Sequence, residues 1–286
     1  MLSMMAVLLS ASVGSLELRV QPLQAEIFVG EPLMAEVTWS AAKHVEVRRP
    51  EQLRVIIMGP GGYRAVLEGP SRYEGVRLPS PIDPGSPLVT EVLLLHGDYL
   101  SERERGRNIL AFPSAGDYAI QVAYDELKAV SKPARVRVVA PEGEEADVFR
   151  ELYGGGRPYD ERRAAALLGK YPHSRYLRMA KLGEIATRLG KVAGGQDPET
   201  GQSFNHLSAD ERRRWQARQV QLALQELESG EWGGWEEERL KLAIDTARGG
   251  GDRESAERLE ADVLQRLPGS ATAQEIMRRR AADVKE

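Results

Sequence analysis

Histidines, acidic residues and glycine-rich turns are the parts of this chain whose chemistry could support catalysis or metal binding. No histidine has a second histidine at the three- or four-residue spacing that places two metal ligands on one helix face. The chain also lacks the G-x-S-x-G turn of serine hydrolases and the G-x-x-x-x-G-K-[ST] loop that holds phosphates. The isolated histidines are His44, His96, His173 and His206. The sequence therefore predicts no catalytic residue, no metal ligand and no cofactor.

One acidic turn has part of the pattern of a calcium-binding loop. Asp197 and Glu199 lie close together before Gly201, but a calcium loop needs glycine at its sixth position and glutamate at its twelfth. Those two positions are Gln202 and Ser208. The turn is therefore not expected to bind calcium.

Two stretches keep a binding hypothesis. The connector Lys191–Leu207 is rich in glycine and polar residues, and Phe204 is its largest apolar side chain. Connectors of this length are uncommon inside compact domains unless they are functional or disordered, and both interpretations stay open. Trp232 and Trp235 lie close together at the expected start of a helix. Tryptophan is frequent at binding hot spots, although two indoles can also cap the core of a helical array.

Composition limits the class of protein. The 286 residues are 42% apolar and 29% charged, which is typical of a globular chain long enough for two ordinary domains. The formal net charge is −4, and basic and acidic residues nearly balance in both halves. Neither half has the basic excess that phosphate binding requires, so no nucleic-acid partner is expected. The absence of cysteine excludes disulfides, thiolate metal sites and cysteine nucleophiles.

The N-terminal stretch has features of an export signal. The apolar run Met4–Leu9 is followed by small residues that would permit cleavage after Ser12 or Gly14. No lysine or arginine precedes this run, so a first strand or a misplaced start codon is the alternative. On the export interpretation, residues 1–14 are a signal peptide and the mature protein is periplasmic or extracellular. No other apolar stretch approaches the roughly 18 residues of a membrane span.

Residues 15–140 carry the pattern of β-strands. Leu33, Ala35, Val37 and Trp39 alternate with more polar neighbours, which predicts one buried face and makes Trp39 a core residue. Breaks rich in glycine and proline, such as Pro79–Pro87, predict turns. Further strands are expected at residues 17–20, 26–29, 53–58, 63–67, 89–95, 118–124 and 134–139.

The segment Phe112–Tyr124 narrows the fold class. Tyr118, Ile120 and Val122 would share one strand face behind a Gly-Asp turn. The stretch resembles the G-x-Y-x-I/V-x-V strand of immunoglobulin-like domains. The resemblance implies an antiparallel β-sandwich, here without a disulfide, in which Tyr118 closes a corner by hydrogen-bonding back to the chain. Such sandwiches host many unrelated functions, so the resemblance predicts a fold alone.

Beyond Pro141–Glu145, expected to be a linker, residues 146–286 carry a helical period. Pro172 ends one helical run and Ser174 is expected to cap the next, because proline cannot continue a helix. Ser208 and Glu211 have the spacing of a capping box. Helices are expected at residues 146–153, 159–170, 174–190, 208–228, 235–248, 253–267 and 270–284.

These helix pairs resemble tetratricopeptide repeats. Ala256 and Pro268 keep the family's spacing between a small residue of the second helix and a helix-ending proline. Glu260 departs from the family, which prefers an aromatic residue at that position. The connector Lys191–Leu207 is also longer than a repeat allows. A plain helical bundle therefore stays open as the alternative.

The resemblance implies a concave surface, lined by the first helix of each pair, that binds a protein or peptide. These helices would be residues 174–190, 235–248 and 270–284. Because an arginine fork holds a carboxylate with two hydrogen bonds, their basic residues predict an acidic partner; a merely solvated face is the alternative. The candidate contacts are Arg175, Arg178 and Lys181, and the other basic residues expected on the solvent side are Arg188, Arg239, Lys241, Arg278, Arg279 and Arg280.

The sequence thus predicts a multidomain chain, all-β and then all-α. Residues 1–14 are the expected signal peptide, 15–140 an immunoglobulin-like β-sandwich, 141–145 a linker and 146–286 a tetratricopeptide-like helical array. The expected function is non-enzymatic binding of a protein or peptide in the bacterial envelope. One alternative is a carbohydrate- or envelope-binding sandwich that uses exposed Tyr63, Tyr73 or Tyr99, with the helices as a spacer. Another is a hydrolase whose site is assembled from scattered acids.

Overall fold

The computed structural model describes residues 16–47, 53–68, 80–94, 96–99, 108–154, 159–204 and 207–283. Within these ranges the chain forms two compact units. One unit holds the β-strands and ends at Val139, and the other holds the α-helices and begins at Ala140. The helical unit also includes the short segment Gly30–Pro32. The expected signal peptide lies outside the described residues.

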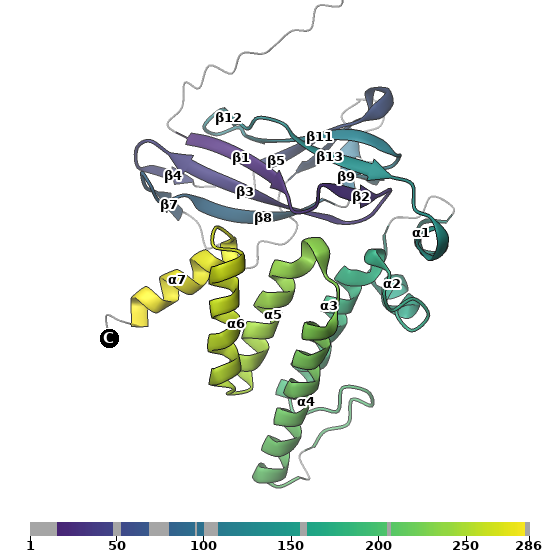
Figure 1. Ribbon diagram of the computed structural model, residues 1–286, viewed down its shortest axis with the longest axis vertical. Helices are drawn as coiled ribbons and strands as arrows, with labels where there is room; N and C mark the ends of the chain where they lie inside the picture. Colours follow the sequence, from purple (N-terminus) through teal and green to yellow (C-terminus); the bar gives the residue numbers. More distant parts are fainter. Residues whose placement is uncertain are drawn as a thin grey trace, which may run out of the picture. The chain divides into compact units, whose positions relative to one another are not determined.

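Short strands build the first unit (Figure 1). Strands β1, β3 and β8 form one sheet, and β4 pairs with β7 in a second. The largest sheet has the order β10-β9-β6-β5-β11-β13-β2, and β12 pairs with β11 beside this path. The strands are β1 (Leu16–Pro22), β2 (Glu26–Phe28), β3 (Leu33–Ala41), β4 (Val45–Val47), β5 (Leu53–Met58), β6 (Arg64–Glu68), β7 (Ser80–Ile82), β8 (Leu88–Leu94), β9 (His96–Tyr99), β10 (Asn108–Leu110), β11 (Gly116–Tyr124), β12 (Ala129–Val130) and β13 (Ala134–Val139).

Strand pairing is antiparallel throughout the described sheets except between β2 and β13, which run parallel. The register of β1 against β3 places Leu18 opposite Trp39, and β3 places Trp39 opposite Leu88. The expectation of a wholly antiparallel sheet is therefore wrong at one edge. The fold is otherwise the antiparallel, sheet-rich region that the strand pattern predicts.

Side chains from two sheets share one core. Trp39 of β3 is 1% exposed, and its indole Nε1 donates to the Thr90 hydroxyl of β8 at 2.9 Å. The ring of Trp39 meets the ring of Tyr124 in β11 edge-on, with centroids 5.4 Å apart. Because β3 and β11 belong to different sheets, this contact joins their inner faces. Trp39 is thus the core residue that the alternation predicts.

The expected tyrosine corner is present. The Tyr118 hydroxyl donates to the backbone carbonyl of Ser114 at 2.9 Å and accepts from its amide at 3.3 Å. A Cβ on Gly59 would lie 2.2 Å from the Tyr118 ring, so the close approach of these two residues requires glycine. Gly116 and Asp117, expected to form a turn, begin strand β11 itself, and the phenol of Tyr118 bonds back to Ser114 just before the strand.

The longer strands agree with the sequence, and several short ones, although not β2, were missed. The predicted bounds of β5 and β13 agree with the structure at both ends. Strand β7 lies inside Pro79–Pro87, which was predicted as a turn. Its three residues, which form three residue pairs with β4, are too few for a period of two to be visible.

Seven α-helices occupy the described part of the second unit (Figure 1). Sequence neighbours pack on one another from α3 onward: α3 on α4, α4 on α5, α5 on α6 and α6 on α7. None of the described helices is both long and apolar enough to cross a membrane. The helices are α1 (Gly143–Tyr153), α2 (Glu161–Leu167), α3 (Arg178–Ala193), α4 (Ala209–Ser229), α5 (Glu236–Gly249), α6 (Arg253–Arg266) and α7 (Ala271–Asp283).

Capping residues set several helix starts. The Ser208 side chain accepts from the amide of Glu211, and the Glu211 carboxylate accepts from the amide of Ser208, which confirms the predicted capping box of α4. Asp252 caps α6 by accepting from the amide of Ser255 at 3.0 Å. These caps satisfy amides that would otherwise lack partners at each helix start.

Two predicted helix starts are wrong. Ser174 donates its hydroxyl to Glu145 at 2.7 Å instead of capping a helix, and a 3₁₀ turn, Arg175–Leu177, precedes α3. Helix α1 begins at Gly143, inside the stretch expected to be a linker. At Ser174, the carboxylate of Glu145 accepts the hydroxyl hydrogen bond, so this side chain does not cap a helix. At α1, the acidic residues of the first turn favour a helix N-terminus at this place.

Candidate binding site

The predicted contacts on α3 are engaged within the helical unit. The guanidinium of Arg175 forms an ion pair with Glu31 at 2.9 Å, and the Glu31 side chain is 0% exposed. Arg178 is half-buried, and this burial lowers the pKa of its guanidinium. The ammonium of Lys181 lies 5.3 Å from the centre of the Trp232 ring. The prediction that these three side chains form an open acidic-partner surface is therefore corrected for Arg175, whose charge is already neutralised.

The two tryptophans are packing residues. Trp232 and Trp235 are 2% and 4% exposed. The indole of Trp232 donates to the carbonyl of Leu227 at 2.9 Å, at the end of α4. Neither ring offers the exposed face that a binding hot spot needs, so the contact hypothesis is wrong and the core-capping alternative holds.

The connector after α3 forms a defined turn in its described residues. Asp197 accepts hydrogen bonds from the amides of Glu199 and Thr200, at 3.0 and 2.7 Å. Phe204 packs on Trp215 of α4, with ring centroids 4.3 Å apart. Phe204 is half-buried by this contact, so its apolar surface is used within the chain. The described residues of the connector therefore do not support the interpretation that it is disordered.

Two more basic residues expected in solvent are paired. Arg239 is buried, and its Nη2 donates to Glu236 at 2.7 Å. Arg188 of α3 pairs with Glu226 of α4. The prediction that both lie on the solvent side fails for Arg239, which is buried and also donates to the carbonyl of Leu227 in α4 at 3.4 Å. Tyr63, expected to be an exposed aromatic, is half-buried and donates to the carbonyl of Leu110 at 2.5 Å.

The remaining tyrosines of the carbohydrate hypothesis give no site. Tyr73 lies outside the described residues, as does the side chain of Tyr99. The Tyr63 hydroxyl donates to a backbone carbonyl, and its ring packs edge-on against the ring of Tyr118, with 5.9 Å between the centroids. The half-buried Tyr63 therefore gives no support to a carbohydrate platform.

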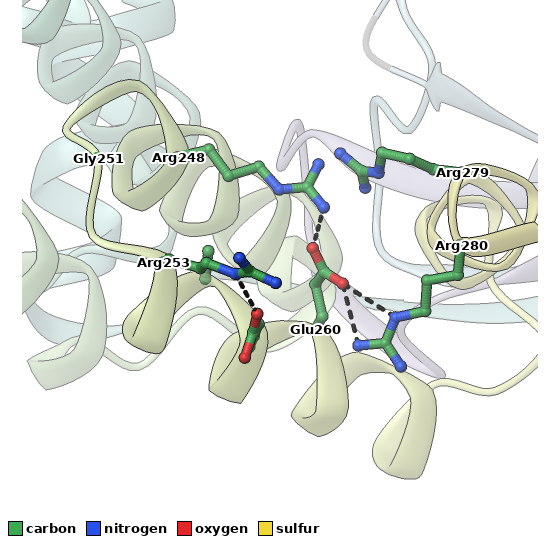
Figure 2. A pocket seen from close by; sticks show the side chains of 8 residues that line it. Arg248, Gly251, Arg253, Glu260, Arg279 and Arg280 are labelled. Carbon is green, nitrogen blue, oxygen red and sulfur yellow. Dashed lines mark hydrogen bonds and ion pairs between the residues drawn. The ribbon is translucent and has the colours of Figure 1, made fainter. Parts of the chain in front are cut away.

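A pocket lies where α5, α6 and α7 meet (Figure 2). Its volume is about 580 Å³, in the range of small-ligand sites. It is lined by the end of α5, the turn before α6, one face of α6 and the middle of α7. The lining residues are Arg248, Gly251, Arg253, Ala256, Glu257, Glu260, Arg279 and Arg280.

Glu260 is the carboxylate that organises this pocket. It is 4% exposed, and arginines from two other helices hold its two oxygens. Arg248 of α5 donates to Oε1, and Arg280 of α7 donates to Oε2 through Nε at 3.2 Å and Nη2 at 3.0 Å. Figure 2 shows the carboxylate between the two guanidinium groups. A buried carboxylate needs such partners, because leaving it unpaired would cost several kcal/mol.

A second ion pair lies at the rim of the pocket. Arg253 donates to Glu257 at 2.6 Å, and this hydrogen bond raises the pKa of the arginine. Both side chains are mostly exposed, at 90% and 60%. The pair therefore adds little stability, because water and salt screen it.

Arg279 is the cation of the pocket to which no described residue is paired. Its Nε is buried and has no hydrogen-bond partner among the described residues. Figure 2 shows its guanidinium extending toward that of Arg248, with no interaction drawn. A buried donor without an acceptor costs about 1–3 kcal/mol, and more when it is charged. The pocket lining thus contains a charged side chain with one hydrogen-bond donor, the Nε of Arg279, that no described residue satisfies.

The described residues contain no cluster of metal-ligating side chains. No group of three or more His, Asp or Glu side chains there is arranged to hold a metal ion. The two carboxylates of the pocket are occupied by arginines, and no histidine lines it. What this arrangement can do chemically is hold an anion by charge and by hydrogen bonds.

Part of this site was visible in the sequence. Arg279 and Arg280 were expected on the solvent side of the last helix, and Glu260 was the departure from the repeat pattern. Arg248 and Arg253 were missed as site residues. The available signal was the glutamate at a position that a repeat fills with an aromatic ring, because a buried acid demands basic partners nearby.

Comparisons with known proteins add no family. No family model and no curated protein matches the chain. Among solved structures, the sporulation control protein Spo0M from Bacillus subtilis matches 45% of this chain and 51% of its own, with 12% identity and a TM-score of 0.28. The alkylpurine DNA glycosylase AlkC from Pseudomonas fluorescens matches 44% and 31%, with 12% identity and a TM-score of 0.28.

A β-glucosidase from Listeria innocua in complex with isofagomine matches 44% of this chain and 16% of its own, with 14% identity and a TM-score of 0.27. The chain thus spans about half or less of these proteins. At such TM-scores the similarity carries no argument about fold or function.

Proposed function

We propose that this chain is a non-enzymatic binding protein of the bacterial envelope that captures a protein or peptide through its helical unit. The observation that carries the proposal is the pocket of about 580 Å³ at α5, α6 and α7, whose lining includes four arginines. A pocket of this kind supports recognition by charge and hydrogen bonds. The proposal includes export, for which the apolar run Met4–Leu9 is the support.

The same proposal includes a specific fold for each of the two units. The strand unit is an immunoglobulin-like sandwich, supported by the Tyr118 corner and by the Trp39–Tyr124 contact between two sheets. The helical unit is a tetratricopeptide-like array, supported by the buried Ala256 and by the serial packing of α3 to α7. Helix-pair arrays present surfaces made from many small contacts, which suits the binding of extended segments.

The absence of cysteine allows a direct test, because one introduced cysteine can be labelled specifically. Arg253 lines the pocket and is 90% exposed, so Arg253→Cys is expected to fold normally. Peptides that bind the full chain are first selected from a displayed peptide library. Their affinity is then measured by fluorescence anisotropy before and after the cysteine is modified with a polyethylene glycol maleimide.

The modified Arg253→Cys protein is expected to lose peptide binding, because the polymer fills the mouth of the pocket. The matched control is Arg218→Cys, an exposed position on α4 that does not line the pocket, carrying the same polymer. Its binding is expected to persist. Failure to select any peptide, or equal binding by both modified proteins, would reject the helical pocket as the binding surface.

A further inference from the structure

We propose that the pocket at α5, α6 and α7 recognises side-chain carboxylates of an acidic segment, and that Arg279 is the residue that receives them. The inference rests on the proposed function and names its ligand chemistry. Three features carry it: the buried Nε of Arg279, the engagement of the other arginines, and the capped N-terminus of α6.

The first feature is the state of Arg279. A guanidinium presents donors in a planar fork, and Nε with one neighbouring Nη matches the two oxygens of a carboxylate. The Nε of Arg279 is buried, yet no described residue accepts from it. Figure 2 shows the guanidinium reaching into the lining of the pocket from α7. A ligand carboxylate in the pocket would pair with this guanidinium, whose side chain lines the pocket and whose Nε has no competing acceptor among the described residues.

The second feature is how the remaining charges are disposed. Glu260 neutralises Arg248 and Arg280 in part, and Glu257 pairs with Arg253. Among the described residues, these contacts leave Arg279 as the lining arginine that has no ion-pair partner. Glu260 also holds Arg248 and Arg280 in place, so that the positive wall behind Arg279 is fixed before a ligand arrives. Such pre-ordering reduces the entropy that binding must overcome.

The third feature separates a carboxylate from a phosphate. Helix N-termini are frequent phosphate sites because their amides are unpaired. Here the Asp252 carboxylate occupies that position at α6, accepting from Ser255 at 3.0 Å. Glu257 and Glu260 lower the net positive charge of the lining, which reduces its extra attraction for a doubly charged phosphate. The surroundings therefore favour the weaker, planar anion.

The arginines that stay exposed at the rim of the pocket favour a peptide segment over an isolated ion. The lining extends from Gly251, before α6, to Arg280 in α7, and Arg253 and Arg280 keep 90% and 48% of their side chains exposed. Neighbouring acidic side chains of one segment can therefore meet Arg253 or Arg280 at the rim while one carboxylate reaches Arg279. Contacts at the rim are screened, so most discrimination should come from Arg279.

The test uses the full chain and two amidated, fluorescein-labelled peptides, one alternating glutamate with glycine and the other glutamine with glycine. Binding is followed by fluorescence anisotropy. The glutamate peptide is expected to bind and the glutamine peptide to bind at least about tenfold more weakly, as loss of a charged hydrogen bond predicts. Inorganic phosphate and a short single-stranded DNA are the competitors, and neither is expected to displace the glutamate peptide better than glutarate does.

Three variants locate the contact. Arg279→Gln is expected to weaken the glutamate peptide by about tenfold or more, and Arg279→Lys by an intermediate factor because lysine keeps the charge and loses the fork. Arg278→Gln is the matched control, since it makes the same charge change one residue away at an exposed position outside the pocket. It is expected to stay within about twofold of the parent chain. Circular dichroism melting establishes that each variant is folded.

Equal losses in Arg278→Gln and Arg279→Gln would show general charge attraction and overturn the proposal. Preferential displacement by phosphate or DNA would overturn the carboxylate assignment. If other peptides bind through the pocket and the glutamate peptide does not, the proposed function stands and this inference falls. If no peptide binds, but glutarate shifts the Arg279 Nε–H resonance and not that of Arg278, the function falls and the carboxylate chemistry stands.

Discussion

Glu260 and Arg280, twenty residues apart on α6 and α7, are joined by two hydrogen bonds to one carboxylate oxygen, from Nε at 3.2 Å and from Nη2 at 3.0 Å. The other oxygen of Glu260 accepts from Arg248 on α5. One buried acid thus connects three helices. A tetratricopeptide-like repeat would place an aromatic ring at this position, whereas here a buried ion pair adds to the apolar packing of the three helices.

Glu260→Gln is expected to lower the free energy of unfolding by about 1–3 kcal/mol, because two arginines lose their shared counter-charge. The estimate stays below that for a fully buried pair since Arg248 and Arg280 keep 31% and 48% of their side chains exposed. Urea denaturation followed by circular dichroism measures the change. Glu257→Gln, on the same helix with an exposed partner, should change stability by less than about 1 kcal/mol. Equal effects of the two variants would contradict a special role for Glu260.

Arg175→Gln is expected to destabilise the protein by about 2–4 kcal/mol, although Arg175 was predicted from sequence to be a surface contact. Its partner, Glu31, is 0% exposed and would be left as a buried carboxylate with fewer partners. Thermal unfolding of the full chain measures the loss. Arg178→Gln, three residues on, is the comparison, and it should cost less because Arg178 has no ion pair to break among the described residues. A larger loss for Arg178→Gln would sink this account of Arg175.

The cap of α6 gives a dependence on pH. Hydrogen bonds from the backbone and side chain of Ser255 lower the pKa of Asp252 below its ordinary value of about 4. A lowered folded-state pKa means that the carboxylate stabilises the helix above pH of about 4 and that this contribution is lost as the pH falls through the lowered value.

Asp252→Ala should therefore cost about 1 kcal/mol at neutral pH and less under acid conditions, where the parent chain has lost the same contribution. Hydrogen exchange of the first amides of α6, measured at several pH values, checks this. Asp210→Ala, an exposed acid in the first turn of α4 that is not its N-cap, is the control. An equal loss at every pH would show that the charge of Asp252 is irrelevant.

Thr90→Val is expected to destabilise the strand unit by about 1–3 kcal/mol. The Trp39 indole would lose its 2.9 Å acceptor inside the core while the volume of the side chain stays nearly unchanged. Thr90→Ser keeps the hydroxyl and should cost less, chiefly through the lost methyl group. Protection of strand amides from hydrogen exchange distinguishes the two variants. If serine and valine weaken protection equally, packing and not the hydrogen bond decides stability at this site.

The sequence pattern was sufficient to predict a strand or a helix start wherever the residues that define it are close together in the sequence. The alternation of Leu33 to Trp39 determined a strand with one buried face, and the spacing of Ser208 and Glu211 determined a helix start, because both depend on neighbours in sequence. The strand-then-helix order of the chain followed from the change of period. Strands of two to four residues, such as β12 and β7, left too few alternations to be recognised.

Tertiary structure decided which charges are used internally. Arg175 and Arg279 were both expected on a face that meets solvent, yet the first is neutralised by the buried Glu31 and the Nε of the second has no described partner. Sequence cannot separate them, because an ion pair between residues 31 and 175 depends on distant backbone segments that the fold brings within 3 Å. In the sequence, Glu260 departs from the repeat pattern. Only the packing of α5, α6 and α7 showed that its carboxylate organises the lining of a pocket.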